Sequence, residues 1–363
     1  MYLQCKRCIM DNESDKTIIF DENCYCNYCT EALKQINTTT YFPNDKGQIK
    51  LEEMIANLKS EGRNKPYDCV MGISGGLDSS YLAYLGYKWG LRILAVHIDD
   101  GYDTKISVRN IKNLCEATNT EIRNIKPDPV QFNALTLAYM KAGVPNIAIP
   151  QDNILFATLY DLMEEQKIKY FLSGGNFALE AILQRGNTHN AMDVVNLKDI
   201  HRKYGTQDIN KLSFITSYKK YINIKIGRSI TLRPLNYINY NREQAINELS
   251  EFCDFEYYGG KHLENILTAF TQLYWFPKKF KVDKRKSHYS SMIISGQITR
   301  EAALEKMKEP LYDDMQMNEY IKIIKNKLEI SDDEFNQIML SPGHQHTDYK
   351  TDKLDKILRK IIR

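Results

Sequence analysis

The chain has 363 residues and a formal net charge of +3, and 43% of its residues are hydrophobic. This length suggests two domains, the composition excludes wholesale disorder, and the balanced charge gives no general argument for binding nucleic acid. No apolar run approaches the length of a membrane span, and residues 1–7 have no signal-peptide core. We therefore expect a cytoplasmic protein with reduced cysteines that binds neither membranes nor nucleic acid.

The residue pattern predicts three regions. Residues 1–45 are rich in cysteine, residues 46–255 alternate strands with helices, and residues 256–363 are mainly helical. In chain order, the expected elements are a helix over 51–60, a strand over 68–73, a helix over 78–89, a strand over 92–98, a helix over 105–117, a strand over 121–125, helices over 129–142 and 152–166, a strand over 169–173 and a helix that begins near 242. Strands that alternate with helices predict an α/β fold with a parallel sheet.

The first region carries two Cys-x-x-Cys pairs. Cys5 and Cys8 form one, Cys26 and Cys29 form the other, and seventeen residues separate them. This spacing is typical of structural zinc (Zn²⁺) sites, in which four thiolates surround the ion and leave no position open for catalysis. Cys24 could replace Cys26, which we prefer because it completes the two-residue spacing. Free buried cysteines are the alternative to a zinc site that stabilises this short segment.

A glycine-rich loop, Ser74-Gly75-Gly76-Leu77-Asp78-Ser79, lies between the first predicted strand and a helix. Glycines let the backbone approach a phosphate closely, and the helix N-terminus receives the anion. Ser74, Ser79 and Ser80 add hydroxyl donors, and Asp78 orients a metal or caps the helix. Because the loop lacks the lysine of the common nucleotide-binding loop, it does not suggest γ-phosphate transfer. The alternative is a glycine turn followed by a helix cap.

This loop resembles the signature of the ATP pyrophosphatase (PP-loop) superfamily, which has an adenine nucleotide alpha hydrolase-like fold. The resemblance implies that an acyl or amide oxygen is adenylated, pyrophosphate is released, and a nucleophile displaces AMP. Asp99-Asp100-Gly101-Tyr102 resembles the segment that holds ATP and magnesium (Mg²⁺) in these enzymes. Ser173-Gly174-Gly175-Asn176 resembles the segment on the acceptor side, so Asp99, Gly174 and Asn176 join the expected ATP site. Either segment could also be an ordinary turn at a strand end.

Three further stretches resemble the N-acetyl sugar amidotransferases of bacterial surface-polysaccharide biosynthesis. They are the cysteine pairs with residues 9–11, residues 258–265, and residues 279–302, and the resemblance covers nearly the whole chain. It implies that an N-acetyl group of an activated sugar becomes an acetamidino group in the synthesis of lipopolysaccharide O-antigen, capsule or flagellin glycan. It also implies that a separate glutaminase subunit supplies ammonia.

A basic run near residue 284 is expected to bind phosphate. Lys284 and Arg285, together with Asp78, are the expected catalytic residues, and Lys284, Arg285 and His288 could reach the pyrophosphate or the diphosphate of the sugar substrate. A solvated helix face with salt bridges is the alternative. Lys261, His262 and Arg300 are open to the same two interpretations. His97, inside a strand, is expected to be a hydrogen-bonded core histidine.

The main rival is a tRNA-modifying enzyme of the thiolation type within the same superfamily. Such enzymes combine this loop with zinc-bound cysteines, but sulfur transfer needs an accessible cysteine or a cluster-binding set near the loop. Cys69, Cys115 and Cys253 show no such spacing and lie in apolar surroundings. A zinc-stabilised nucleotide sensor, which would bind ATP without releasing pyrophosphate, is the non-enzymatic alternative.

Overall fold

The protein is built on a parallel β-sheet. A computed structural model describes residues 2–353, and in these residues five strands pair in the order β3-β2-β1-β4-β5 with every neighbouring pair parallel. The strands are β1 (Cys69–Gly72), β2 (Ile93–Ile98), β3 (Ile122–Ile125), β4 (Tyr170–Leu172) and β5 (Ile230–Leu232). The predicted α/β class with a parallel sheet is confirmed.

Helices cover both faces of the sheet, which is why its central strands are almost wholly apolar. Met71 of β1 and Ala95 of β2 face one core, which α3 (Leu77–Lys88), α4 (Lys105–Thr118) and α10 (Arg242–Cys253) complete. Val70 and Leu94 point to the opposite face and pack against α6 (Ile149–Glu165). The alternation of side chains along a strand therefore assigns neighbouring residues to different cores.

The fifth strand was not predicted. Residues 230–232 form β5, which pairs with β4 over three residues at the edge of the sheet. Its sequence, Ile230-Thr231-Leu232, lies between Arg228 and Arg233 and forms no continuous apolar run of the kind that indicated β4, so only the pairing with β4 defines this strand. Between β4 and β5 the chain forms α7 (Phe177–Glu180), α8 (Val194–Tyr204) and α9 (Ser217–Lys225).

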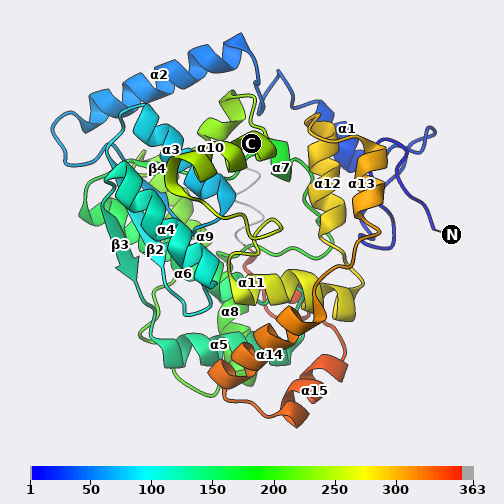
Figure 1. The fold of residues 1–363 in the computed structure, drawn as a ribbon. Helices are drawn as coiled ribbons and strands as arrows, with labels where there is room; N and C mark the ends of the chain where they lie inside the picture. The colour runs from blue at the N-terminus through cyan, green and yellow to red at the C-terminus, as the bar shows by residue number, and fades with distance from the viewer. Residues whose placement is uncertain (1, 354–363) are drawn as a thin grey trace.

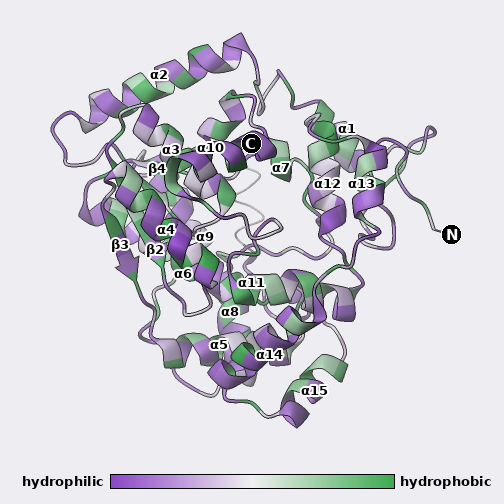
Figure 2. Cartoon of the chain, viewed as in Figure 1, coloured by the Kyte–Doolittle hydropathy of each residue, from purple (hydrophilic) through white to green (hydrophobic). Residues whose placement is uncertain are grey.

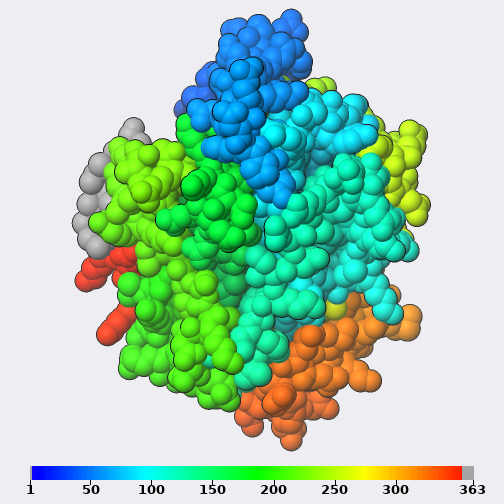
Figure 3. Space-filling view, turned by 90° about the vertical axis from the view of Figure 1, so that its left-hand side faces the viewer, coloured from blue at the N-terminus to red at the C-terminus, as the bar shows by residue number. Residues whose placement is uncertain are grey.

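A second core lies beside the sheet domain. It joins α5 (Pro129–Ala142) and α8 to α11 (Ile266–Phe270), α14 (Asp314–Leu328) and α15 (Asp332–Leu340), with a π-helical segment, Thr271–Phe280, that buries Trp275 completely. Hydrophilic and hydrophobic residues alternate along α14, as expected for a helix with one buried side (Figure 2). α2 (Asp45–Gly62) and α14 lie at opposite ends of the molecule (Figures 1 and 3).

The N-terminal segment packs against a distant part of the chain. α1 (Asn27–Leu33) lies beside α12 (Arg285–Ile294), and α12 also contacts α13 (Arg300–Lys306) (Figure 1). Short 3₁₀ turns occupy Pro234–Tyr237 and His346–Asp348. Over residues 2–353, every helix is too short or too polar to cross a lipid bilayer.

The strand order determines where ligands can bind. From β1 the chain continues to β2 and β3 on one side, then returns to β4 and β5 on the other side of β1. The carboxyl ends of β1 and β4 therefore flank the point where the winding direction reverses, which is the usual ligand site of open α/β sheets. The glycine-rich loop follows β1, and Ser173-Gly174-Gly175-Asn176 follows β4.

Candidate active site

The loop after β1 is held by its own hydroxyl groups. The Gly76 backbone N–H donates to Ser74 Oγ at 3.2 Å, and Ser79 Oγ donates to the Gly76 carbonyl at 3.2 Å. Gly75 has a φ of +74°, and a Cβ there would lie 2.4 Å from the Ser107 carbonyl oxygen. Only glycine allows both this left-handed conformation and the close approach of α4.

This loop opens onto a cavity of about 310 Å³. The loop, the Gly174–Gly175 turn after β4, residues 257–264, and α12 with the residues just before it form its walls. The polar side chains and glycines that line the cavity include Ser74, Gly76, Asp78, Ser79, Gly174, Glu180, Arg242, Lys261, His262, Glu264, Gln272, Lys284, Arg285 and His288. Segments 200 residues apart in the sequence therefore meet at the switch point of the sheet.

Asp78 is the acidic residue of the loop. Tyr240 donates a hydrogen bond to Asp78 Oδ1 at 2.6 Å, and the Lys261 ammonium forms an ion pair with Asp78 Oδ2. The side chain of Asp78 is 16% exposed. Asp78 is thus fixed at the cavity wall by two groups, neither of which belongs to the loop.

Lys261 links Asp78 to a second carboxylate. Its ammonium lies 3.1 Å from Glu180 Oε1, and His262 Nε2 lies 3.5 Å from the same oxygen. Burial alone would raise the pKa of Glu180, but the Lys261 ammonium and the nearby His262 side chain hold it well below its usual value. Burial would lower the pKa of Lys261, but Asp78 and Glu180 outweigh it and raise that pKa. Lys261 therefore stays protonated between two anions.

The basic run forms the opposite wall. Burial lowers the pKa of the Lys284 ammonium, which has no ion-pair partner in residues 2–353. Burial, with the positive field of Lys284, keeps the pKa of His288 well below its usual value, so His288 is neutral near pH 7. Arg285 is already engaged, because its guanidinium binds the Asp283 carboxylate at 2.8 Å and the Glu309 carbonyl at 2.9 Å. Lys284 is therefore the better placed of the two predicted cations to meet an anionic ligand.

Glu264 and Gln272, like Glu180, line the cavity but were not assigned a role from the sequence. Glu264 accepts a hydrogen bond from Ser74 Oγ at 3.1 Å, while its buried Oε2 has no hydrogen-bond partner in the described chain. Gln272 is 8% exposed and lies on the π-helical segment, a conformation that is frequent at functional sites. Glu264 belongs to the stretch 258–265 that the sequence singled out, whereas no sequence signal pointed to Gln272.

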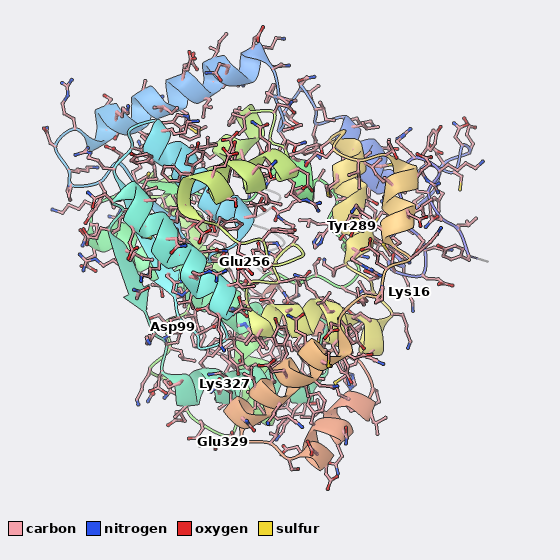
Figure 4. All side chains as sticks on the ribbon, viewed as in Figure 1. Lys16, Asp99, Glu256, Tyr289, Lys327 and Glu329 are labelled. Carbon is pink, nitrogen blue, oxygen red and sulfur yellow. The ribbon has the colours of Figure 1, made fainter. Side chains whose placement is uncertain are left out.

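Four residues expected at the ATP site do not line the cavity. Gly75 belongs to the loop but faces Ser107 of α4, and Ser80 is completely buried. Asn176 caps α7 by accepting a hydrogen bond from the Leu179 N–H at 3.0 Å. Asp99 pairs with Lys126 at 2.8 Å. Figure 4 shows Asp99 beside the sheet, on the other side of the view from Tyr289 on α12.

The residues that follow Asp99 instead support the cavity wall. Asp100 accepts hydrogen bonds from the Tyr102 N–H at 2.9 Å and from Asn265 Nδ2 at 3.2 Å. The Thr104 N–H donates to the Glu264 carbonyl at 3.1 Å. This turn therefore holds the segment that carries Glu264.

His97 is a buried, hydrogen-bonded histidine, as expected. Its Nδ1 lies 2.9 Å from the Ile73 carbonyl oxygen and its Nε2 lies 2.9 Å from Asp103 Oδ2. Burial by itself lowers the pKa of His97, but the hydrogen bond and negative charge of Asp103 raise it above its usual value. His97 therefore ties the end of β1 to the turn after β2.

The four predicted zinc ligands converge on one point. Cys5 and Cys29 Sγ are 3.7 Å apart, Cys8 and Cys26 Sγ are 3.5 Å apart, and all four sulfur atoms lie within 4.8 Å of one another. Thiolates around a tetrahedral zinc ion are separated by about 3.8 Å. The Cys26 N–H points to Cys5 Sγ at 3.2 Å, a donor that stabilises a thiolate. This buried cluster could hold a zinc ion.

Cys24 lies outside this cluster. Its φ is +60°, and its thiol contacts the Gln4 carbonyl oxygen at 3.6 Å. The backbone turn directs Cys26 inward and Cys24 away. Cys69, Cys115 and Cys253 do not line the cavity, and burial raises the pKa of each thiol.

Part of the sequence that forms the cavity matches a known protein family. Residues 264–362 match the family described as "LPS biosynthesis protein WbpG-like, C-terminal domain". The matched segment begins at Glu264 and includes the π-helical segment and α12, which form one side of the cavity. The WbpG-like segment therefore supplies much of the site opposite the glycine-rich loop. No curated protein matches the sequence significantly.

Three solved structures are similar to the chain at low scores. NMN synthetase from Francisella tularensis has 14% identity and a TM-score of 0.38, with 78% of this chain and 97% of that one covered. NH3-dependent NAD synthetase from Campylobacter jejuni subsp. jejuni NCTC 11168 has 16% identity, a TM-score of 0.35, and coverage of 82% and 97%. U34-tRNA thiolase NcsA from Methanococcus maripaludis has 14% identity, a TM-score of 0.32, and coverage of 84% and 89%. These similarities are too weak to assign a function.

Proposed function

We propose that the protein is an ATP-dependent amidotransferase of lipopolysaccharide biosynthesis that converts an N-acetyl group of an activated sugar to an acetamidino group. The observation that carries the proposal is the single cavity shared by the glycine-rich loop and the WbpG-like segment. One wall offers backbone N–H groups, serine hydroxyls and a helix N-terminus to phosphate. The other offers Lys284, His288 and Gln272 to a second substrate.

The residues present fit ATP with magnesium. The pyrophosphate of ATP would lie on the loop at the N-terminus of α3, beside Ser74 and Ser79. Asp78 and Glu264 would hold Mg²⁺, because carboxylate oxygens are the ligands it prefers and Glu264 Oε2 has no other partner among the described residues. When bound, Mg²⁺ neutralises charge on the phosphate oxygens. Lys261, which now balances Asp78 and Glu180, would add a further positive charge.

The proposed reaction has two steps. The amide oxygen of the N-acetyl group attacks the α-phosphorus of ATP, a C–O–P linkage forms, and pyrophosphate leaves. Ammonia then attacks the amide carbon, a C–N bond forms, the C–O bond breaks, and AMP leaves with the oxygen. One proton leaves the attacking nitrogen, and neutral His288 at the cavity wall can accept it. The main contribution of the protein is to position the reactants and to stabilise developing negative charge.

Two further components belong to this proposal. Ammonia would come from a separate glutaminase subunit that binds this chain. A zinc ion would bind Cys5, Cys8, Cys26 and Cys29, in a closed structural site apart from the reacting atoms. The rival thiolation reaction has no support from the cavity, because none of the lining residues in the described chain is a cysteine.

The test is release of pyrophosphate and AMP from ATP with ammonium and a panel of N-acetylated nucleotide sugars, followed by product mass. We expect release that depends on one sugar and a product about one mass unit lighter, because NH replaces O. The Asp78→Asn variant should lose this release and stay folded by circular dichroism. Release that depends on tRNA, or a product of unchanged mass, would reject the proposal. If no release occurs, the assay is repeated with a glutaminase partner and glutamine.

A further inference from the structure

Helix α12 lies between the four-cysteine cluster and the cavity. On the cluster side, the Ile9 N–H donates to Ser290 Oγ at 3.2 Å, and Lys286 forms an ion pair with Asp11. On the adjoining face, Ser291 Oγ accepts from the Ile182 N–H at 2.9 Å, just after α7. α12 is therefore held by the N-terminal segment and by the sheet domain at once.

Arg300 makes a second connection to the cluster. Its Nε lies 3.0 Å from the Cys8 carbonyl oxygen, and its Nη2 lies 3.1 Å from the Cys5 carbonyl oxygen. One guanidinium therefore binds both carbonyls of the Cys5–Cys8 turn. A planar, charged donor with fixed geometry holds such a turn far more rigidly than a lysine would. Arg300 is the first residue of α13, which packs against α12.

The face of α12 that packs against the N-terminal segment and the residues after α7 is completely buried. Ser287, Ser290 and Ser291 are all completely buried, and these small side chains allow the neighbouring backbones to approach closely. Asp11 is also completely buried, and its only ion pair in residues 2–353 is with Lys286. Burial by itself raises the pKa of Asp11, and Lys286 lowers it below its usual value. Separating α12 from the N-terminal segment would leave a buried charge without its partner.

We propose that the four-cysteine cluster is a positioning device for the cavity: through Arg300 and the Asp11–Lys286 pair it places α12, and with it Lys284 and His288, against the glycine-rich loop. Arg300 is a positioning residue that touches no substrate. A metal ion held by the four thiolates would fix the Cys5–Cys8 turn, and this turn positions α12 through Arg300 and α13. The kinetic part of this inference rests on the proposed function, whereas the structural part does not.

The experiment compares the Arg300→Gln variant with Lys308→Gln in the full chain. Lys308→Gln is a matched control, because it removes one positive charge just beyond α13, where Lys308 pairs, among residues 2–353, only with the exposed Glu305. Metal analysis, thermal unfolding and hydrogen exchange are measured for both. Arg300→Gln should keep its zinc, and amides of residues 285–294 should exchange about tenfold faster, since charge-assisted hydrogen bonds are lost. Amides of β1 should be unchanged, and the control should match wild type.

Two further measurements make the outcome decisive. Removal of the metal from wild type by a chelator should also accelerate exchange in 285–294. In the pyrophosphate assay, Arg300→Gln should raise KM for the sugar about tenfold without changing KM for ATP. Unchanged exchange in 285–294, after either perturbation, overturns the inference. If Arg300→Gln does not fold, Arg300→Lys replaces it. If no sugar-dependent release exists, the proposed function fails while the exchange data still decide this inference.

Discussion

Replacement of Lys261 by methionine tests the charge arrangement of the cavity. The Lys261 side chain is 10% exposed, and its ammonium pairs with Asp78 and lies 3.1 Å from Glu180 Oε1. Methionine retains most of the apolar stem and removes the charge. Two carboxylates are then left partly buried without their shared cation. We expect the variant to be less stable and to release no pyrophosphate.

The size of the effect follows from the distance. Two unit charges 3.1 Å apart attract by about 5 kcal/mol at an effective dielectric constant of about 20. This value must be reduced, because Glu180 is 25% exposed and water partly stabilises a carboxylate that loses its partner. Breaking a buried pair by removing one partner costs about 3 to 5 kcal/mol. We therefore expect the free energy of unfolding to fall by about 3 kcal/mol near pH 7.

The assay is urea unfolding of wild type and Lys261→Met between pH 3 and pH 7. Lys261 holds the pKa of Glu180 below its usual value of 4.5, so the stability from this pair is present above that pH. It is lost as pH falls through the lower pKa of the folded state. The difference between the two proteins should therefore be largest at pH 7 and shrink toward pH 3. Lys112→Met, at a side chain that is 71% exposed, is the control.

Two results would refute this reasoning. One is a loss below about 1 kcal/mol at pH 7, the value expected of a surface ion pair. The other is an equal fall in the free energy of unfolding at pH 7 and pH 3, which would indicate that the variant loses side-chain packing and not a charge interaction. Adding Glu180→Gln to Lys261→Met should recover part of the stability, because it removes one of the two stranded carboxylates.

Three further predictions concern the loop, the turn after β2 and the metal cluster. Gly75→Ala should destabilise the fold by about 2 kcal/mol and abolish ATP binding by calorimetry, because φ is +74° and the new Cβ meets the Ser107 carbonyl; wild-type affinity would contradict this. Burial raises the pKa of Asp100 to about 6. Ionisation of the buried carboxyl therefore lowers the free energy of unfolding as pH rises from about 4 through 6. In urea unfolding, the free energy of unfolding of Asp100→Asn relative to that of wild type should rise by up to about 3 kcal/mol from pH 4 to pH 7. A difference between the two proteins that stays constant with pH would exclude this cause. Cys26→Ser should lose the metal and Cys24→Ser should keep it, by metal analysis of the purified proteins; the reverse would exchange their roles.

Features with a local physical cause were predictable from the sequence alone. Four of the five strands were predicted from short stretches of apolar residues near turns, whereas β5, with Thr231 at its centre and Arg228 and Arg233 close to its ends, does not form such a stretch. Gly75 was expected because the loop needs a conformation that other residues avoid. The paired spacing of the cysteines was sufficient to indicate a four-thiolate cluster.

Contacts between distant segments were decided only by the tertiary structure. Asp99 follows β2 as the resemblance required, yet the turn directs it to Lys126 and away from the cavity. Glu264 and Gln272 line the cavity because residues 264–272 pack beside the glycine-rich loop, where Ser74 Oγ donates to Glu264, and no local pattern encodes that contact. The sequence by itself determined the sheet, the loop and the cysteine pairs, since each depends on neighbours a few residues away. Which charges face one another depends on packing between segments hundreds of residues apart, and only the folded chain specifies it.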